Sequence, residues 1–172
     1  GFYMKFSKPF TCKIIDTPIN TEREGKPFVM NRSKALLQFA TENDEEVLVK
    51  VGISAVDING ARQNVEKEIP SWNFDSIATA AQNEWNNYLK TIEIESNDET
   101  SKKIFYTALY HTAIHPSLFT DIDGRYRGID GLIHRAETDE SIYTVYSLWD
   151  TFRALHPLFT IIDSELNDKL VI

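Results

Sequence analysis

The chain has 172 residues, of which 42% are hydrophobic and 12% are aromatic. A chain of this length and composition can bury a core, which excludes intrinsic disorder as its main description. The formal net charge of −8 at pH 7 disfavours binding to the phosphate backbone of nucleic acid and to anionic lipid. No apolar run approaches the roughly 20 residues of a membrane-spanning helix. We therefore expect neither nucleic-acid nor membrane partners.

Residues 1–57 have the pattern of β-structure. Every second residue of 47–53 is β-branched, which predicts a strand with one apolar face. We predict a second strand over 35–40, joined to the first as a hairpin by a polar turn at 42–45, and a third strand over 11–16. Because so few strands cannot close a sandwich, we expect this region to be the C-terminal part of a β-domain that begins upstream.

Helical periodicity begins after this region. We predict a short helix over 59–67 and an amphipathic helix over 73–90, which make residues 58–95 a helical linker. Residues 96–99, Ser-Asn-Asp-Glu, match a capping box and predict the start of another helix, which ends near His115.

The last predicted helix runs from Tyr143 to Asp163, with a kink at Pro157. An aromatic ring can stack on the apolar face of a sugar, while carboxylate and guanidinium groups bind paired hydroxyls. The alternative is an internal Asp150–Arg153 ion pair beside an ordinary core tryptophan. At 100° per residue, one side of this helix combines aromatic and charged groups of the kind that bind sugars: Tyr146, Trp149, Asp150, Arg153 and His156.

The segment 121–128 resembles a calcium loop only superficially. An EF-hand would need an oxygen ligand at Arg125, glycine at Tyr126 and glutamate at Leu132, so we expect no calcium there. Two alternatives stay open: a structural hairpin built on Asp-Gly turns, or a substrate-facing loop that presents Arg125 and Arg127.

Three other residues could suggest metal or redox chemistry. His111 and His115 have the spacing of a zinc pair, but the metalloprotease motif requires a glutamate where Thr112 stands. We therefore expect His115 at a helix end, bonded to the backbone or lining a cleft. The single Cys12 is expected to be a buried structural residue.

Several segments together resemble glycoside hydrolase family 92, whose members are calcium-dependent, exo-acting α-mannosidases. The resemblance covers about residues 50–165. The linker motif over 69–75, Ile-Pro-Ser-Trp-Asn-Phe-Asp, is similar to that of the family. The matching segments that follow it are 106–112 (YTALYHT), 115–121 (HPSLFTD), 123–128 (DGRYRG) and 143–157 (YTVYSLWDTFRALHP).

The resemblance implies a β-sandwich, a helical linker and an (α/α)6 barrel, with the active site between the two domains. The chain would then be an α+β fragment: residues 1–57 form the end of the sandwich, 58–95 the linker and 96–172 the truncated start of the barrel. The family's acid and base carboxylates and most of its calcium ligands come later in the barrel, so we expect the isolated chain to be inactive.

The resemblance also implies substrate-binding residues. Trp149 and Asp150 match the pair that contacts the terminal mannose, and Arg153 belongs to the same motif. Four more positions match the family and are expected to line the cleft: His115, Asp121, Arg125 and Arg127.

The implied function is part of an inverting exo-α-mannosidase, acting on α-1,2 linkages of mannose-terminated glycans. Calcium is the implied cofactor, with ligands outside this chain, and the remainder of the same polypeptide is the implied partner. The implied location is secreted, periplasmic or cell-surface. Two other functions stay open: a non-catalytic carbohydrate-binding or adhesive β-sandwich module, and a glycoside hydrolase or phosphorylase of another α/α-barrel family.

Overall fold

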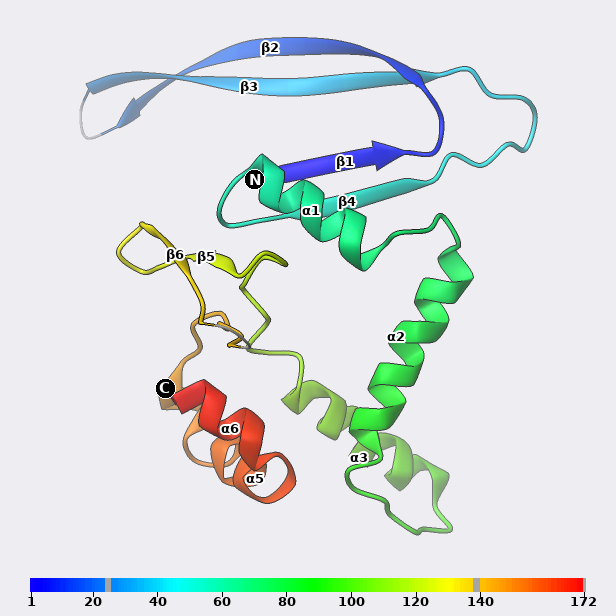
Figure 1. Cartoon of the computed structure of the whole chain (residues 1–172), viewed down its shortest axis with the longest axis vertical. Coiled ribbons are helices and arrows are strands. Elements are labelled where there is room, and N and C mark those ends of the chain that lie inside the picture. Colours follow the sequence, from blue (N-terminus) through cyan, green and yellow to red (C-terminus); the bar gives the residue numbers. More distant parts are fainter. Residues whose placement is uncertain (24–25, 138–139, 172) are drawn as a thin grey trace. The chain divides into compact units, whose positions relative to one another are not determined.

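The computed structural model describes residues 1–23, 26–137 and 140–171. These residues form two-stranded β-sheets and α-helices (Figure 1), which confirms the predicted α+β fold class. None of the helices in this described part is long and apolar enough to cross a membrane.

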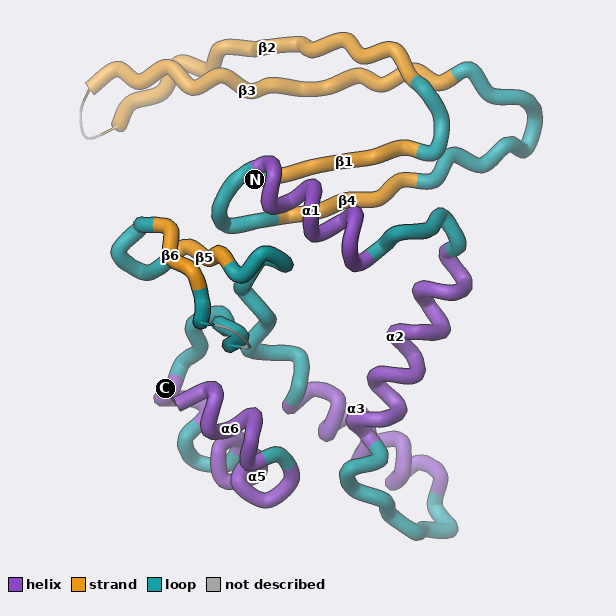
Figure 2. Tube along the Cα trace, in the orientation of Figure 1, coloured by secondary structure: helices purple, strands orange, loops and turns teal. Residues whose placement is uncertain are grey.

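The chain divides into two compact units. The smaller unit comprises Met4–Lys50, and the larger comprises Val51–Ile172 together with Gly1–Tyr3. The smaller unit is built on the long strands β2 (Phe10–Arg23) and β3 (Lys26–Phe39), drawn in orange in Figure 2. They pair antiparallel over their whole length, from Phe10 opposite Phe39 to Arg23 opposite Lys26.

Strand pairing differs from the prediction. The strand predicted over 35–40 lies within β3, but it pairs with β2 and not with β4 (Val49–Ile53), which pairs with β1 (Phe2–Phe6). The turn over 42–45 does form, with the Glu45 N–H donating to the Glu42 carbonyl at 3.4 Å, yet it does not close a hairpin. The prediction was wrong because β2 and β3 are consecutive strands of equal length that pair with each other along their whole length, which leaves β4 to pair with β1.

Side-chain burial in the strands also differs from the prediction. Cys12 is exposed, not buried, because both faces of a two-stranded ribbon are open to solvent. In β4 the side chains alternate as predicted, but the apolar face is the exposed one: Val49, Val51 and Ile53 are exposed, whereas Lys50 and Gly52 are buried. A Cβ on Gly52 would lie 2.4 Å from Cγ2 of Val65 and 2.3 Å from the carbonyl oxygen of Ala61. Glycine therefore lets the first helix approach this strand closely.

The first three helices form where the sequence predicts them. They are α1 (Ile58–Glu68), α2 (Phe74–Leu89) and α3 (Glu99–Thr112). Each begins after a residue whose side chain accepts a hydrogen bond from a first-turn N–H, as an N-cap does. These N-caps are Asp57, Asn73 and Asp98.

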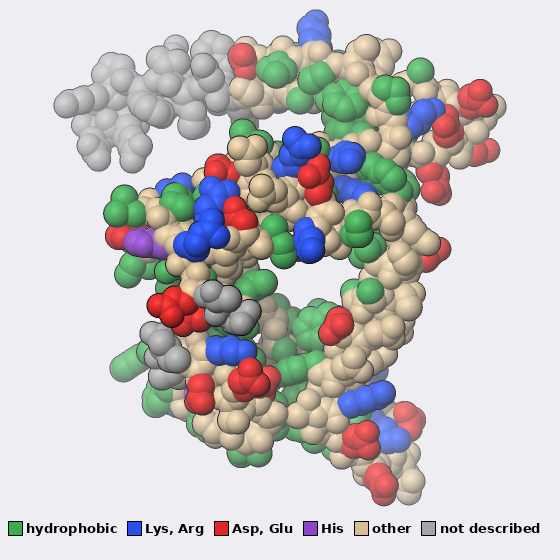
Figure 3. Space-filling model, viewed as in Figure 1, with side chains coloured by type: hydrophobic (Ala, Val, Ile, Leu, Met, Phe, Trp, Pro, Cys, Tyr) green, Lys and Arg blue, Asp and Glu red, His purple; other side chains and the backbone are tan. Residues whose placement is uncertain are grey.

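Helices α2 and α3 are in contact through aromatic side chains. The rings of Trp85 and Tyr110 have centroids 4.4 Å apart at an angle of 61°. The buried apolar residues of the larger unit include Ala61, Val65, Leu109 and Phe159. Many other large apolar side chains remain at the surface, where Figure 3 shows hydrophobic and charged groups interspersed.

The single helix predicted over 143–163 does not form. Residues 143–147 are not helical, and the helices that follow are α4 (Leu148–Thr151), α5 (Leu155–Ile162) and α6 (Ser164–Val171). Tyr143 instead makes an isolated antiparallel bridge with Leu118. The break before α5 has a clear cause: Pro157 has no N–H and its ring clashes with a carbonyl four residues earlier, so it is accepted only in the first turn of a helix.

Candidate functional site

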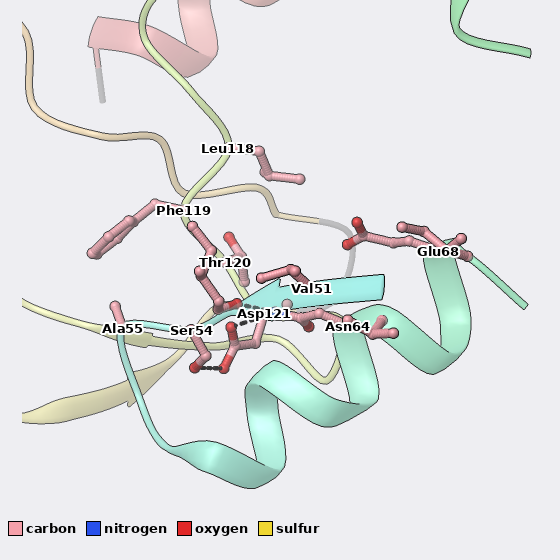
Figure 4. A pocket seen from close by; sticks show the side chains of 13 residues that line it. Val51, Ser54, Ala55, Asn64, Glu68, Leu118, Phe119, Thr120 and Asp121 are labelled. Atoms are coloured by element: carbon pink, nitrogen blue, oxygen red, sulfur yellow. Dashed lines mark hydrogen bonds between the residues drawn. The ribbon is translucent and has the colours of Figure 1, made fainter. Parts of the chain in front are cut away.

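A buried aspartate lies at the junction between β4, α1 and the segment after α3 (Figure 4). Asp121 is only 5% exposed. One carboxylate oxygen accepts a hydrogen bond from the Ser54 hydroxyl at 2.6 Å, and the other accepts one from the Asn64 side-chain amide at 2.9 Å. A buried carboxylate is costly unless such donors stabilise it. Asp121 therefore joins these three segments of the chain. A substrate contact by Asp121 stays a prediction.

Asn64 is the centre of this polar junction. In addition to Asp121, its side-chain amide donates to the carbonyl of Ile53 at 3.0 Å, and its side-chain oxygen accepts from the N–H of Ile122 at 2.9 Å. Sequence reasoning missed Asn64 and Ser54. No sequence signal marks them, because an asparagine in a helix and a serine before one are ordinary polar residues.

Arg125 begins the hairpin of β5 (Arg125–Arg127) and β6 (Ile133–Arg135). Its Nε donates to Asp123 at 2.7 Å and its Nη1 donates to Asp57 at 2.9 Å. The hydrogen bond from Arg125, and then that from the Gly60 N–H, lower the pKa of the Asp57 carboxyl. Burial raises the pKa of Asp123, but the hydrogen bonds from Arg125 outweigh it and the pKa is lowered. These carboxylates in turn raise the pKa of Arg125.

Arg127 donates hydrogen bonds to backbone carbonyls of the hairpin turn and of the segment before α1. Its Nε donates to Ala55 at 2.8 Å, its Nη1 to Gly131 at 2.7 Å and its Nη2 to Val56 at 3.3 Å. Gly131 has a φ of 78°, the left-handed conformation that an Asp-Gly turn requires. The structure therefore favours the structural hairpin over the substrate-facing loop, while substrate contacts by Arg125 and Arg127 stay predictions.

The residues considered for metal binding do not assemble into a metal site. Among the described residues, no group of three or more His, Cys, Asp or Glu side chains is arranged to hold an ion. Asp121 and Asp123 both accept hydrogen bonds from protein donors. His115 lies after the end of α3, with its Nε2 3.1 Å from the Val145 carbonyl oxygen.

Trp149 and Asp150 stand on the four-residue helix α4. Trp149 is 85% exposed, and Asp150 is exposed as well. The carbonyl of Ser147 accepts hydrogen bonds from the N–H of Asp150 at 3.0 Å and of Thr151 at 3.2 Å, which fixes this turn of helix. The indole and the carboxylate are thus both accessible, on consecutive residues of a short helical turn.

The predicted Asp150–Arg153 ion pair is absent from the described part of the chain. Arg153 lies outside α4, in the turn between α4 and α5, and the carbon of its guanidinium lies 5.4 Å from the centre of the Phe152 ring. Because the helix is broken between Thr151 and Leu155, the spacing that would pair Asp150 with Arg153 does not apply. The Asp150 carboxylate is therefore not neutralised by its nearest sequence partner.

The remaining two members of the predicted sugar-binding face serve internal packing. The rings of Tyr146 and His156 have centroids 5.3 Å apart. The Tyr146 hydroxyl donates to the carbonyl of Leu170, and His156 Nδ1 lies 3.1 Å from the side-chain oxygen of Asn167. Tyr146 and His156 thus join the segment before α4 to α5 and α6, so the single face predicted for all five residues was wrong.

Comparison with known proteins places these observations in a family. The model of the glycosyl hydrolase family 92 catalytic domain matches residues 60–172. A curated relative, an uncharacterized secreted glycosidase of Arthroderma benhamiae, is 30% identical over 87 residues, which are 48% of this chain and 11% of the relative.

Solved structures of the same family resemble almost the entire chain. The family GH92 alpha-mannosidase BT3965 from Bacteroides thetaiotaomicron has 35% identity and a TM-score of 0.82, covering 98% of this chain and 23% of that one. The GH92 glycosyl hydrolase ccman5 has 26% identity and a TM-score of 0.82, covering 99% and 22%. The inverting mannosidase BT2199 from Bacteroides thetaiotaomicron VPI-5482 has 27% identity and a TM-score of 0.78, covering 98% and 23%.

The chain spans less than a quarter of the length of each of these proteins. Within that span the family model covers residues 60–172, which include Asn64 and Asp121 of the polar junction, the β5–β6 hairpin and helix α4. The chain therefore belongs to glycosyl hydrolase family 92.

Proposed function

We propose that the protein containing this chain is an exo-acting, inverting α-mannosidase that removes terminal mannose from glycans, with a preference for α-1,2 linkages. The observation that carries the proposal is the exposed Trp149 beside the unpaired Asp150 on α4, in a chain of family 92. The names of the related structures support it, since BT3965 is an alpha-mannosidase and has been solved with mannoimidazole, and BT2199 is an inverting mannosidase.

The chemistry of the two side chains suits a terminal sugar. The indole of Trp149 offers an apolar face to the C–H groups of a pyranose ring, and the Asp150 carboxylate can accept hydrogen bonds from two neighbouring hydroxyls. Because no arginine or lysine of the described residues neutralises Asp150, its full charge is available to the sugar. We assign Trp149 and Asp150 to substrate binding, with Arg153 near them in the chain and His115 in contact with the Val145 carbonyl before α4.

The hydrolytic step belongs to residues outside this chain. An inverting glycosidase needs a general acid and a general base about 6.5–9.5 Å apart, so that a water molecule fits between the sugar and the base. We assign neither role here, and we expect the isolated chain to be inactive. We also propose that calcium is held by residues outside the chain. We propose that the protein is secreted, periplasmic or attached to the cell surface. The relative named a secreted glycosidase supports this location.

Replacement of Asp150 in the full-length enzyme tests the proposal. A charged acceptor that binds a buried hydroxyl contributes roughly 1.5–3 kcal/mol per hydrogen bond, so Asp150→Ala should lower kcat/KM for α-mannosides by at least about a hundredfold. Part of the loss should appear in kcat, because the bound sugar is held through the same hydroxyls in the transition state.

The matched control is Asp168→Ala, which removes an exposed aspartate from α6. It should leave kcat/KM unchanged. If Asp150→Ala keeps near-normal kcat/KM and only lowers the melting temperature, Asp150 is a structural residue and the assignment is refuted. If the full-length protein binds mannose-terminated glycans but releases no mannose, it is a carbohydrate-binding module and not an enzyme.

A further inference from the structure

His115 joins the segment after α3 to the segment that leads into α4. Its Nε2 lies 3.1 Å from the carbonyl oxygen of Val145, which stands shortly before Leu148, the first residue of α4. A carbonyl oxygen only accepts hydrogen bonds, so Nε2 carries the proton and donates the bond. The neutral and the charged imidazole can both carry a proton on this nitrogen, so a neutral donor is sufficient for the contact.

This contact extends a stretch of paired backbone. The N–H of Phe119 donates to the carbonyl of Ile142 at 2.7 Å, and the N–H of Thr144 donates to the carbonyl of Ser117 at 2.8 Å. The Ser117 N–H in turn donates to the Thr144 hydroxyl at 3.0 Å. The two segments are thus held against each other, and of these bonds the one from the His115 side chain is closest to α4 in the sequence.

Helix α4 depends on such contacts for its position. A helix of one turn is not stable by itself, and within the described part of the chain the side chain of its N-cap, Ser147, makes no capping hydrogen bond. The chain after α4 is anchored by Phe159 of α5, which is 1% exposed. The chain before it is anchored by the bond from His115 and by the Tyr146 hydroxyl, which donates to the backbone of α6.

The two proposed sugar-binding side chains of α4 differ in how strongly they depend on position. Hydrogen bonds from hydroxyls to the Asp150 carboxylate need a defined distance and direction. Stacking of a sugar on the broad indole of Trp149 tolerates a small shift. A displacement of about 1 Å in a binding group can lower the rate of an enzyme strongly, so Asp150 is the side chain that a loosened turn affects most.

We propose that His115 is a positioning residue, which holds the Asp150 carboxylate in its sugar-binding position by donating to the Val145 carbonyl. The proposal rests on the proposed function above. It gives His115 a role other than the direct sugar contact that the family resemblance implies. A binding group held in place in advance loses less conformational entropy when the ligand arrives. The competing roles of His115 are a direct contact with the sugar and a purely structural one.

The first test uses the full-length enzyme and an aryl α-mannoside. His115→Phe keeps a planar ring and removes the donor, and it should lower kcat/KM about three- to tenfold, with part of the loss in kcat. His115→Gln offers an amide N–H in place of Nε2 and should keep kcat/KM within about twofold of wild type. The matched control is His111→Phe, the same substitution at an exposed histidine of α3, which should have no effect.

A double-mutant cycle with Asp150→Ala separates positioning from direct contact. If His115 acts through Asp150, His115→Phe should lower kcat/KM less than about twofold in the Asp150→Ala background, because the group that it positions is gone. Equal losses in the two backgrounds mean that His115 contacts the sugar itself, and they overturn the proposal. If His115→Phe does not fold, His115→Asn takes its place, because its amide is too short to replace Nε2.

Three other results are decisive. A loss in His115→Gln as large as that in His115→Phe overturns the proposal, because the donor would then not be what matters. A lower melting temperature with normal kinetics gives His115 a structural role and overturns it too. If Asp150→Ala alone leaves kcat/KM near normal, the assignment of Asp150 in the proposed function fails, whatever the His115 variants show.

Discussion

Replacing Asn64 with alanine should destabilise the larger unit strongly. The substitution removes three hydrogen bonds at once: those to Asp121, to the Ile53 carbonyl and to the Ile122 N–H. Loss of the hydrogen bond to Asp121 costs the most. The Asp121 carboxylate is only 5% exposed, and one of its oxygens would lose its donor. A hydrogen bond to a buried charged group contributes about 1.5–3 kcal/mol.

The other two bonds contribute less. They lie in an exposed part of the structure, where water can replace the lost partner, so we assign them about 0.5 kcal/mol each. The expected loss in the free energy of unfolding is therefore about 2.5–4 kcal/mol, against about 5–15 kcal/mol for the stability of a typical protein. Asn64→Asp should be worse at neutral pH, because it places a second carboxylate beside Asp121.

The assay is urea unfolding of the full-length protein, followed by tryptophan fluorescence. Gln63→Ala is the matched control, since Gln63 is the exposed neighbour of Asn64 on α1 and should change the free energy of unfolding by less than about 0.5 kcal/mol. If the free energy of unfolding of Asn64→Ala differs from that of wild type by less than about 0.5 kcal/mol, the junction does not stabilise the molecule and the reasoning is wrong.

Three further predictions follow from local geometry. Gly60→Ala should cost about 1–3 kcal/mol in unfolding experiments, because the added Cβ would lie 2.2 Å from Asp121 Oδ2; an unchanged midpoint would contradict this. Asn73→Ala should cost about 1 kcal/mol, because Asn73 caps α2 by accepting from the Ser76 N–H at 3.0 Å; circular dichroism during melting measures it. The lowered pKa values of Asp57 and Asp123 mean that their contacts with Arg125 contribute fully above the unfolded pKa values and are lost as pH falls through the folded ones. Arg125→Gln should therefore lower the melting temperature at pH 7 and have less effect below about pH 4, whereas an equal effect at both pH values would exclude the ionic contact.

The predictable part of the fold is local. Helices α1 to α3 have apolar side chains at helical spacing and an Asp or Asn at the N-cap, and both signals depend only on neighbours in the sequence. The β5–β6 hairpin was foreseen as one alternative from its Asp-Gly turns, for the same reason. Strand pairing was predicted wrongly, because strands were expected only over 11–16 and 35–40, whereas β2 and β3 extend to Arg23 and Lys26 and pair with each other as consecutive strands.

The last helix shows how a periodic pattern can mislead. The apolar spacing from Val145 to Ile162 continues across the turn after Thr151, yet Val145, Leu148 and Phe152 are exposed and Phe159 of α5 is buried, so the pattern does not mark one buried helix face. Pro157 was recognised as a kink, yet its position in the first turn of α5 marks a new helix start. The pair Trp149–Asp150, which we propose binds the substrate, was identified through the family motif, whereas Ser54 and Asn64 were missed because their importance arises only from the residues that fold against them.

The polar junction makes the intervening chain a closed loop. Asn64 and Asp121 are in contact although 57 positions separate them, and α2 and α3 lie entirely within that excursion. The entropy of closing a flexible loop grows only with the logarithm of its length, so doubling the excursion would cost about 0.6 kcal/mol. The contact between α1 and the segment at Asp121 therefore depends little on the length of the chain between them. Extra residues in the connection between α2 and α3 should be tolerated with little loss of stability.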